Sequence, residues 1–396
     1  MDAPRLLTTR DELAALADAA RRAGRLALDT EFVWERTYRP ILGLVQVAID
    51  DEVSLIDPVA LRDLSPLFPV LGDPALPVVL HGGGQDLDIF AHLMGEPIRG
   101  VVDTQVEAAF LGYGLQVGLT VLLERVLKVR IKKDQTYTDW VRRPLRTEQL
   151  VYAAEDVRHL LPLHDRLRAE LETRGRTEWA AEELQAAERP DRYAPTPPAE
   201  RYRSLKGWQR LGGRDLAVLR ELAAWRERAA ERADVRPNFI ANDVVLTSLA
   251  ARPPAGPADL RNVRGLSTGT ADRHGKAILA AVRDGLACPE DRWPEKPGRT
   301  RGRAPAPGLT ALLRAAVQAV AEREDIAPEV IASGREIDAL AAHPGDDAGA
   351  EGLAVTRGWR RELVGDLLLA IARGDLGIRY DPRRHAVVAM PAAPAR

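Results

Sequence analysis

The sequence contains a single cysteine, Cys288, in 396 residues. An intramolecular disulfide needs two cysteines, so a disulfide-stapled fold is excluded, as is any zinc site built on two or more cysteines. The sequence also has no apolar run near the roughly 20 residues of a membrane span, and no signal-peptide core in its opening stretch. We therefore expect a cytoplasmic protein in a reducing compartment, with no membrane contact.

An excess of charge of either sign is also missing, because 56 Lys and Arg face 58 Asp and Glu and leave a formal net charge of −2. This balance excludes a globally basic surface, so any contact with a polyanion must be local. The glycines at 82–84 lack the G-x-x-x-x-G-K-[ST] pattern of a phosphate-binding loop, which argues against a nucleotide cofactor. The length predicts a protein of more than one domain.

The first part of the sequence predicts an α/β domain over residues 1–185. A helix with capping-box spacing opens this domain, and a short buried strand, LPVVLH, is followed by alternating helix and strand patterns. A long helical segment over 147–175, interrupted or kinked near Pro162, closes it. Three further strand-like runs lie at 25–33, 42–49 and 52–57. This order favours a mixed sheet with helices packed on it.

The second part predicts two small all-α domains separated by linkers. The segments 235–251 and 326–342 align without gaps, with Pro, Ile and Leu in the same order. Chance identity among the many alanines is the alternative to a duplicated domain. We predict linkers at 186–211 and 289–307, both rich in proline. The two helical domains and a C-terminal tail are predicted at 212–288, 308–376 and 377–396.

Two acidic residues in the strand LALDTEFV give the clearest chemical signal. Asp29 and Glu31 are two residues apart, so their side chains leave the same face of a strand. Like charges placed side by side repel, and an apolar strand carries them more readily when a cation lies between them. The alternative is a solvent-exposed strand end that is acidic without a ligand.

Three further residues in the same domain extend this pattern. Asp86 follows the glycines at a predicted helix start, while Tyr152 and Asp156 lie one helical turn apart in YAAEDV. Each alone is more simply explained as an exposed helix residue. Together, the four carboxylates offer the oxygen ligands that Mg²⁺ or Mn²⁺ takes, and they could hold two ions about 3.5–4 Å apart for displacement at phosphorus. Tyrosine, with an ordinary pKa of about 10, would orient a water rather than act as a base.

Several of these motifs resemble those of a known family of enzymes. LALDTEF, LHGGGQDLDIF and YAAEDV resemble the exonuclease motifs of the DEDD superfamily, and DTQVEAAF and TDW resemble the ribonuclease D family. The resemblance implies a ribonuclease H-like mixed sheet with flanking helices. Tyr152 takes the position that defines the tyrosine branch, since Val151 stands where the histidine branch has its histidine; Asp88 competes with Asp86 in the second motif. The implied metal ligands, which with Tyr152 form the catalytic set, are Asp29, Glu31, Asp86 and Asp156.

The helical domains resemble the HRDC domains that follow the exonuclease domain in this family and bind nucleic acid. The second copy departs from the pattern at HPGDDAGAEG. Separately, the stretch from Glu124 to Arg146 carries eight basic residues against three acidic ones, which predicts a path for a phosphate backbone; an ordinary solvated face is the alternative. The candidate substrate-binding residues are Lys132, Lys133, Arg142 and Arg143.

The aromatic and histidine residues say less about function than the acidic motifs do. Trp34, Tyr137 and Trp140 are predicted to pack rather than to stack on bases. His81 ends a predicted buried strand and is left open between a core histidine and one that approaches the site.

Motifs and resemblance together predict a metal-dependent 3′–5′ exoribonuclease that uses two divalent cations, Mg²⁺ or Mn²⁺. It would release nucleoside 5′-monophosphates from RNA with a free 3′ end, with transfer RNA precursors as the expected substrate. Two alternatives remain: a 3′–5′ DNA exonuclease of the same superfamily, and a non-catalytic RNA-binding scaffold. The sequence predicts no oligomeric state.

Overall fold

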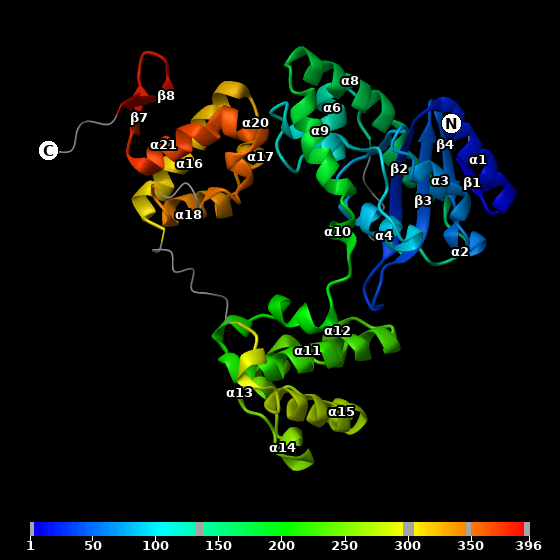
Figure 1. The fold of residues 1–396 in the computed structure, drawn as a ribbon. Coiled ribbons are helices and arrows are strands. Elements are labelled where there is room, and N and C mark those ends of the chain that lie inside the picture. The colour runs from blue at the N-terminus through cyan, green and yellow to red at the C-terminus, as the bar shows by residue number, and fades with distance from the viewer. Residues whose placement is uncertain (1–3, 132–137, 296–304, 346–349, 392–396) are drawn as a thin grey trace. The chain divides into compact units, whose positions relative to one another are not determined.

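The computed structural model of the protein divides the chain into two compact units (Figure 1). Unit 1 comprises Met1–Glu31, Leu42–Tyr193 and Gly302–Arg396, and unit 2 comprises Phe32–Ile41 and Ala194–Arg301. The structure describes residues 4–131, 138–295, 305–345 and 350–391. Among these residues, none of the helices combines the length and apolar character needed to cross a bilayer.

A six-stranded mixed sheet lies at the centre of the α/β domain of unit 1, in the order β1-β4-β3-β2-β5-β6. β3 and β4 pair antiparallel, whereas β1 with β4, β2 with β5, and β5 with β6 are parallel. The predicted mixed sheet is confirmed, although β1 is too short to show a sequence pattern. The strands are β1 (Arg5–Leu7), β2 (Leu26–Val33), β3 (Ile41–Ile49), β4 (Glu52–Ile56), β5 (Val78–Leu80) and β6 (Val101–Asp103).

Helices cover both faces of this sheet. The opening helix has the predicted capping box, formed by Thr9 and Glu12. The predicted helix over 147–175 breaks at His159, so that Pro162 falls in the first turn of the next helix, where its missing N–H is not needed. The helical elements are α1 (Arg10–Ala23), α2 (Pro58–Leu61), η1 (Ser65–Leu67), α3 (Phe68–Leu71), α4 (Gly84–Met94), α5 (Thr104–Ala109), α6 (Leu119–Val126), α7 (Thr147–Arg158), α8 (Leu160–Thr173), α9 (Thr177–Gln185), η2 (Ala186–Glu188) and α10 (Pro190–Tyr193).

Strand alternation assigns the residues of β2 to two different cores. Leu26 and Leu28 belong to a core with α1, α3 and α4, whereas Ala27 belongs to a core with α5, α6 and α8. Because side chains alternate along a strand, Asp29 and Glu31 continue the face of Ala27. Thr30 continues the face that α4 covers. The two predicted acidic residues therefore share one face of the sheet, as expected.

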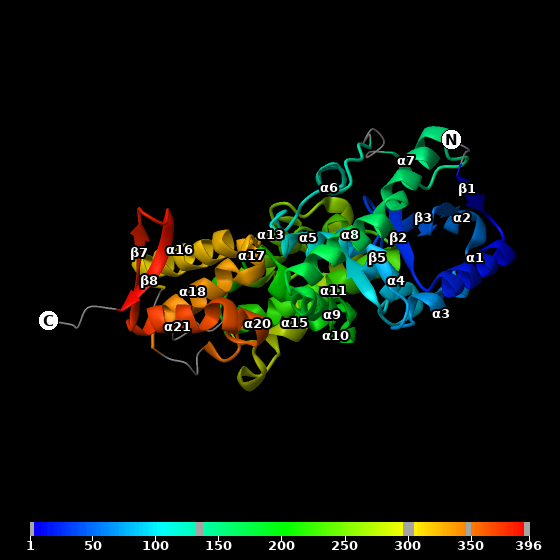
Figure 2. The ribbon, with the colours of Figure 1, turned by 90° about the horizontal axis from the view of Figure 1, so that it is seen from above.

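The remainder of unit 1 forms the second helical domain, described here over 305–345 and 350–391. The predicted tail is wrong in part, because it folds into an antiparallel hairpin of β7 and β8, which Figures 1 and 2 both show beside α16 and α21. The elements of this domain are α16 (Pro307–Glu324), α17 (Pro328–Ile331), α18 (Gly334–Ala342), η6 (Ala354–Thr356), α20 (Gly358–Arg360), η7 (Arg361–Gly365), α21 (Asp366–Arg373), β7 (Leu376–Asp381) and β8 (Ala386–Pro391).

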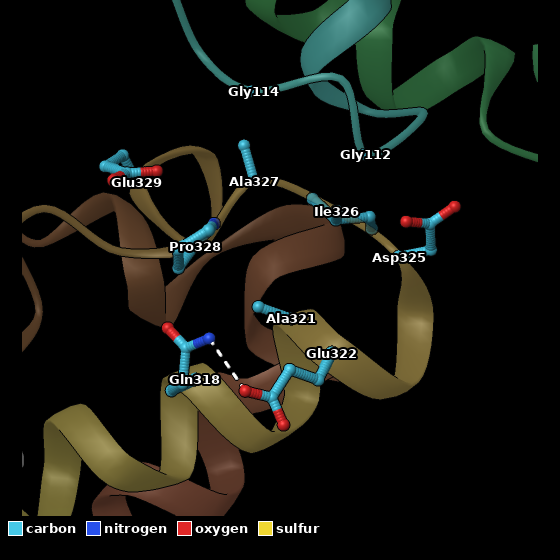
Figure 3. Close-up of a pocket in the computed structure, with 10 residues that line it drawn as sticks. All are labelled: Gly112, Gly114, Gln318, Ala321, Glu322, Asp325, Ile326, Ala327, Pro328 and Glu329. Carbon is cyan, nitrogen blue, oxygen red and sulfur yellow. Dashed lines mark hydrogen bonds between the residues drawn. The ribbon is translucent and has the colours of Figure 1, made fainter.

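The second helical domain packs directly on the α/β domain, as one continuous hydrophobic core contains residues of both. Figure 3 shows the loop of Gly112 and Gly114 opposite the end of α16, across a groove of about 240 Å³. At Gly112, whose φ is +81°, a β-carbon would lie 2.1 Å from an Asp325 carboxylate oxygen. The positive φ favours glycine here, and a larger residue would also displace the Asp325 side chain.

Unit 2 contains the first helical domain, whose core surrounds α11. The prediction of a simple linker over 186–211 is wrong, because Tyr202, Leu205 and Trp208 are buried in this core. The elements are η3 (Pro198–Ser204), η4 (Trp208–Arg210), α11 (Gly213–Ala233), α12 (Pro237–Ile240), α13 (Asp243–Ala251), α14 (Pro257–Arg261), α15 (Thr268–Leu286) and η5 (Glu290–Arg292).

The two helical domains have the same backbone geometry where α11 leads into α12 and where α16 leads into α17. This repeated corner supports the predicted duplication. α11 ends at Asp234 with φ of 47°, and α16 ends at the aligned Asp325 with φ of 50°. The next short helices, α12 and α17, end at Ala241 and Ala332, with φ of −160° and −152°. A polar side chain then caps the following helix in both domains. Chance identity does not explain repeated backbone geometry.

Candidate active site

A pocket of about 180 Å³ lies where β2, β5 and α7 of unit 1 meet. The structure brings together here four of the five residues predicted as catalytic. β2 contributes its two acidic residues, and α7 contributes the tyrosine and aspartate one turn apart. The lining residues are Asp29, Glu31, His81, Leu119, Tyr152, Asp156 and Leu160.

Asp86, the fifth predicted residue, lies beside this group rather than on the pocket wall. It sits in the first turn of α4 with 7% of its surface exposed and accepts a hydrogen bond from the Thr30 hydroxyl. Its charge is nevertheless close enough to act on Asp29. Asp88, the competing acid, is exposed and is influenced by Arg192 instead. The geometry therefore favours Asp86 over Asp88.

The glycine turn before α4 sets the position of Asp86. Gly82, with φ of +66°, turns the chain after β5, and a β-carbon on Gly83 would lie 2.7 Å from the Leu80 side chain. The carboxylate of Asp103, at the end of β6, accepts the N–H groups of Gly82 and Gly83 at 2.9 and 3.1 Å. The turn is thus fixed by a neighbouring strand, and α4 begins where Asp86 can face β2.

Burial and the closeness of negative charges together raise the pKa of carboxyl groups at the pocket. Burial raises the pKa of Asp29 well above its usual value, and the charges of Asp86, Asp156 and Glu31 raise it further. The pKa of Asp86 is also raised, mainly by burial, although the Thr30 hydroxyl lowers it. A divalent cation would relieve this repulsion, because it favours the ionised carboxylates.

The donor set fits a hard cation, since the carboxylates offer only oxygen. Within the described parts of the chain, however, no three His, Cys, Asp or Glu side chains are arranged so that they could hold a metal ion. The pocket therefore brings carboxylates close together, but in this structure they do not form a closed set of metal ligands. Asp86, whose carboxylate accepts a hydrogen bond from Thr30, is not among the residues that line the pocket.

The aromatic predictions have different outcomes. Trp140 is 2% exposed and packs against Tyr152, with ring centroids 6.2 Å apart, which confirms its packing role. Trp34 is 41% exposed in unit 2, where the Arg236 guanidinium lies 5.6 Å from its ring, so the prediction of a core residue is wrong. Tyr137 lies outside the described residues.

The structure describes only Arg142 and Arg143 of the four predicted substrate-binding residues. Lys132 and Lys133 lie outside the described residues, and Arg142 is exposed. Arg143 donates to the Asp57 carboxylate and to the carbonyls of three residues, namely Gly43, Trp140 and Arg142. These bonds use the donors of its guanidinium inside the protein, which contradicts a phosphate-binding role for Arg143.

His81 is the pocket residue that sequence reasoning left unassigned. One ring nitrogen lies 2.9 Å from the Thr104 hydroxyl and the other 3.0 Å from the Val117 carbonyl. The imidazole thereby joins β5 to the chain that leads into α6 and Leu119. Its place at the carboxyl end of a parallel strand, where ligands bind in open α/β sheets, was the available signal.

Comparison with known proteins agrees with this arrangement. Residues 4–172 match a family model described as 3′–5′ exonuclease, and residues 215–282 match the HRDC domain model. The chain is 38% identical to Ribonuclease D of Gluconacetobacter diazotrophicus over 385 residues, which cover 96% of each chain. It is 37% identical to Ribonuclease D of Acidiphilium cryptum over 392 residues, covering 98% of each.

A solved structure is similar over the same length. The crystal structure of Escherichia coli RNase D, an exoribonuclease involved in structured RNA processing, matches with a TM-score of 0.83 and 34% identity. The match covers 93% of this chain and 99% of that one. The similarity thus extends beyond the α/β domain into the helical domains.

Proposed function

The chain belongs to the ribonuclease D family of 3′–5′ exoribonucleases, and on that premise we propose that it trims transfer RNA precursors with two divalent cations, Mg²⁺ or Mn²⁺. The observation that carries this proposal is the pocket in which Asp29, Glu31, Tyr152 and Asp156 meet, with the charge of Asp86 beside them. The family relation supports the reaction, and the crowded carboxylates support the cations.

The reaction adds water to the last phosphodiester of the RNA. The bond between phosphorus and the 3′ oxygen breaks, so a nucleoside 5′-monophosphate leaves and the shortened RNA keeps a new 3′ hydroxyl, which takes up a proton. When bound, the cations would activate the water and stabilise charge on the leaving oxygen. The ligands we propose are Asp29, Glu31, Asp86 and Asp156.

The remaining pocket residues would bind and orient the substrate. The Tyr152 hydroxyl would hold the water in line with phosphorus, because a neutral phenol donates and accepts hydrogen bonds but is a weak base. Leu119 and Leu160 provide apolar surface against which the terminal nucleotide would pack. The matched HRDC domain of unit 2 would add to RNA binding, and Arg142 would contact phosphate.

A time course on a 3′-extended transfer RNA precursor tests the proposal. We expect wild-type protein with Mg²⁺ or Mn²⁺ to shorten the 3′ end one nucleotide at a time and to stop near the mature end. Asp29→Asn should abolish trimming, whereas Asp88→Asn, which changes an exposed acid on the same helix as Asp86, should not. Undiminished trimming by Asp29→Asn would contradict the proposed site.

Thermal unfolding gives a readout of the cations that is independent of activity. A raised pKa means that Asp29 and Asp86 stabilise the fold only below their unfolded pKa, and that this stability is lost as pH rises through the folded value. Ionised carboxylates therefore destabilise the cation-free protein at neutral pH. We expect Asp29→Asn to raise its Tm, and Mn²⁺ to raise the Tm of wild type more than that of the variant.

The two alternatives predict different results in the same assays. A DNA exonuclease would degrade a matched DNA strand faster than the RNA strand. A non-catalytic scaffold would show neither trimming nor a Tm response to Mn²⁺, while still binding RNA.

A further inference from the structure

An ion pair between the buried Asp57 carboxylate and the half-buried Arg143 guanidinium joins the end of β4 to the loop before α7. The Asp57 carboxylate is 4% exposed and accepts the N–H groups of Val59 and Ala60 at 3.0 and 3.1 Å. It also accepts two bonds from Arg143, at 2.7 Å from Nε and 2.6 Å from Nη2. Burial raises the pKa of Asp57, but these hydrogen bonds outweigh burial and leave it below the usual value. Bidentate, buried pairs of this kind have a well-defined geometry.

Arg143 uses its other donors to attach the loop to the sheet. Nη2 donates to the Gly43 carbonyl of β3 at 2.7 Å, and Nη1 donates to the Trp140 carbonyl at 2.8 Å. The two backbones are so close that a β-carbon on Gly43 would lie 2.7 Å from both the β-carbon and the carbonyl oxygen of Trp140. The position of Trp140 is therefore fixed from two sides.

Trp140 passes this constraint to the pocket. Its indole lies against the Tyr152 ring, with centroids 6.2 Å apart and planes inclined by 35°, and both side chains are buried. A second tie joins the same loop to α7, because Gln149, 4% exposed, donates to the Thr138 hydroxyl at 3.0 Å. The phenol of Tyr152 is thus held by a loop whose own anchor is Asp57.

We propose that Arg143 and Asp57 are positioning residues for the Tyr152 hydroxyl, and that they act through Trp140 without touching RNA. This inference rests on the proposed function, since it assigns Tyr152 the task of orienting water. A water held in line with phosphorus is sensitive to small displacements of its partner, so loosening the anchor lowers the rate of the chemical step while substrate binding persists.

Steady-state kinetics on a short RNA oligonucleotide test this. We expect Arg143→Gln to lower kcat about tenfold and to leave KM within about twofold, as for loss of an interaction made in the transition state. The matched control is Arg360→Gln, which removes a partly buried arginine bonded to Glu183 and to the Val330 carbonyl, far from Tyr152 in the sequence. Its kcat should equal that of wild type at a comparable loss of Tm.

A double-mutant cycle separates positioning from direct contact. In a Tyr152→Phe background, Arg143→Gln should have no further effect on kcat, because the hydroxyl it positions is gone. Multiplying losses, with a KM that rises with salt concentration, would overturn the inference in favour of a phosphate contact. If Arg143→Gln does not fold, Trp140→Phe is the second variant: it keeps an aromatic ring and should lower kcat at constant KM, and an unchanged kcat would overturn the proposal.

The result also distinguishes this inference from the proposed function. Inactive wild-type protein contradicts the proposed function itself. Active wild type with an unaffected Arg143→Gln variant leaves that function standing and contradicts only the positioning role.

Discussion

The two helical domains share a repeated corner but differ in what their hydrophobic residues contact. The first closes its own core around α11 within unit 2. The second contributes to the core of the α/β domain, in which residues such as Leu313 and Ile371 belong to the same cluster as Ala27 and Val79. The two helical domains thus share backbone turns, while hydrophobic residues of the second belong to the same core as those of the α/β domain.

Specific polar and aromatic contacts fix the second domain in this place. Arg176, 7% exposed, donates to the Phe110 carbonyl at 2.8 Å, to the Glu324 carbonyl, and to the Asp325 carbonyl at 3.4 Å. Trp359 stacks on Trp179 with centroids 5.1 Å apart. Arg176 thereby satisfies the buried Phe110 carbonyl and two carbonyls at the end of α16, where the helix leaves its last C=O groups without intrahelical partners. These contacts give the second helical domain a structural role within unit 1.

Replacing a central aromatic residue in each helical domain should give the largest difference in nuclease activity between the two domains. Trp359→Ala removes a 4% exposed ring from the shared core and should cost about 3–5 kcal/mol of unfolding free energy. Because the shared core also supports α8, we expect this variant to lose nuclease activity as it unfolds. Activity on a short oligonucleotide and the thermal unfolding profile measure both effects.

The control is Trp225→Ala in the first domain, where the ring is 5% exposed. It should cost a similar free energy but unfold unit 2 alone, with short-oligonucleotide activity retained. Equal loss of activity in both variants would contradict the distinction between the domains.

A buried arginine in each domain offers a second, smaller test. Arg176→Met leaves the buried Phe110 carbonyl without this donor and should destabilise unit 1 by about 1–3 kcal/mol. The counterpart is Arg226, 6% exposed, which donates to the Ala241 carbonyl at 3.0 Å and to Asp243 at 2.8 Å. Arg226→Met should lower the stability of unit 2 only, as measured by hydrogen exchange in the two units. Loss of exchange protection in unit 1 on changing Arg226 would contradict this.

The smallest expected effect is a pH dependence confined to unit 2. Burial, followed by a hydrogen bond of 2.6 Å to Glu227, raises the pKa of Tyr38 from 10.0 to about 12. The stability that this bond contributes is therefore full below pH 10.0 and is lost as pH rises towards about 12. Tyr38→Phe should remove the difference in unit 2 stability between pH 9 and pH 11 that wild type shows, as followed by urea unfolding. A dependence that persists in the variant would assign it to another group.

Local patterns predicted the parts of the molecule that depend on neighbours in sequence. Alternation in LALDTEFV placed Asp29 and Glu31 on one face, and helical spacing placed Tyr152 beside Asp156, as the structure has them. Arg143 was misjudged because it lies among basic residues in sequence, while its partner Asp57 lies 86 residues earlier. A side chain that pairs over such a distance leaves no periodic signal.

The same limit explains the errors in the helical half. The proline-rich stretch before α11 looks like a linker, but Tyr202 and Trp208 pack against each other and into the core. Likewise, nothing in the repeat distinguishes a copy that closes its own core from one that completes another. That property depends on the residues that face each copy, such as Phe110 and Trp179, and not on the copy itself.

The shared core also sets the order in which the protein can fold during synthesis. Ala27 and Ile371 belong to the same core but lie on opposite sides of unit 2 in the sequence, so this core cannot be complete until both segments have been synthesised. Until then the apolar surface around Phe110 and Trp179 has no cover, whereas unit 2 already has all of its residues by Arg301. We therefore expect unit 2 to be able to complete its own core before the shared core of unit 1 forms.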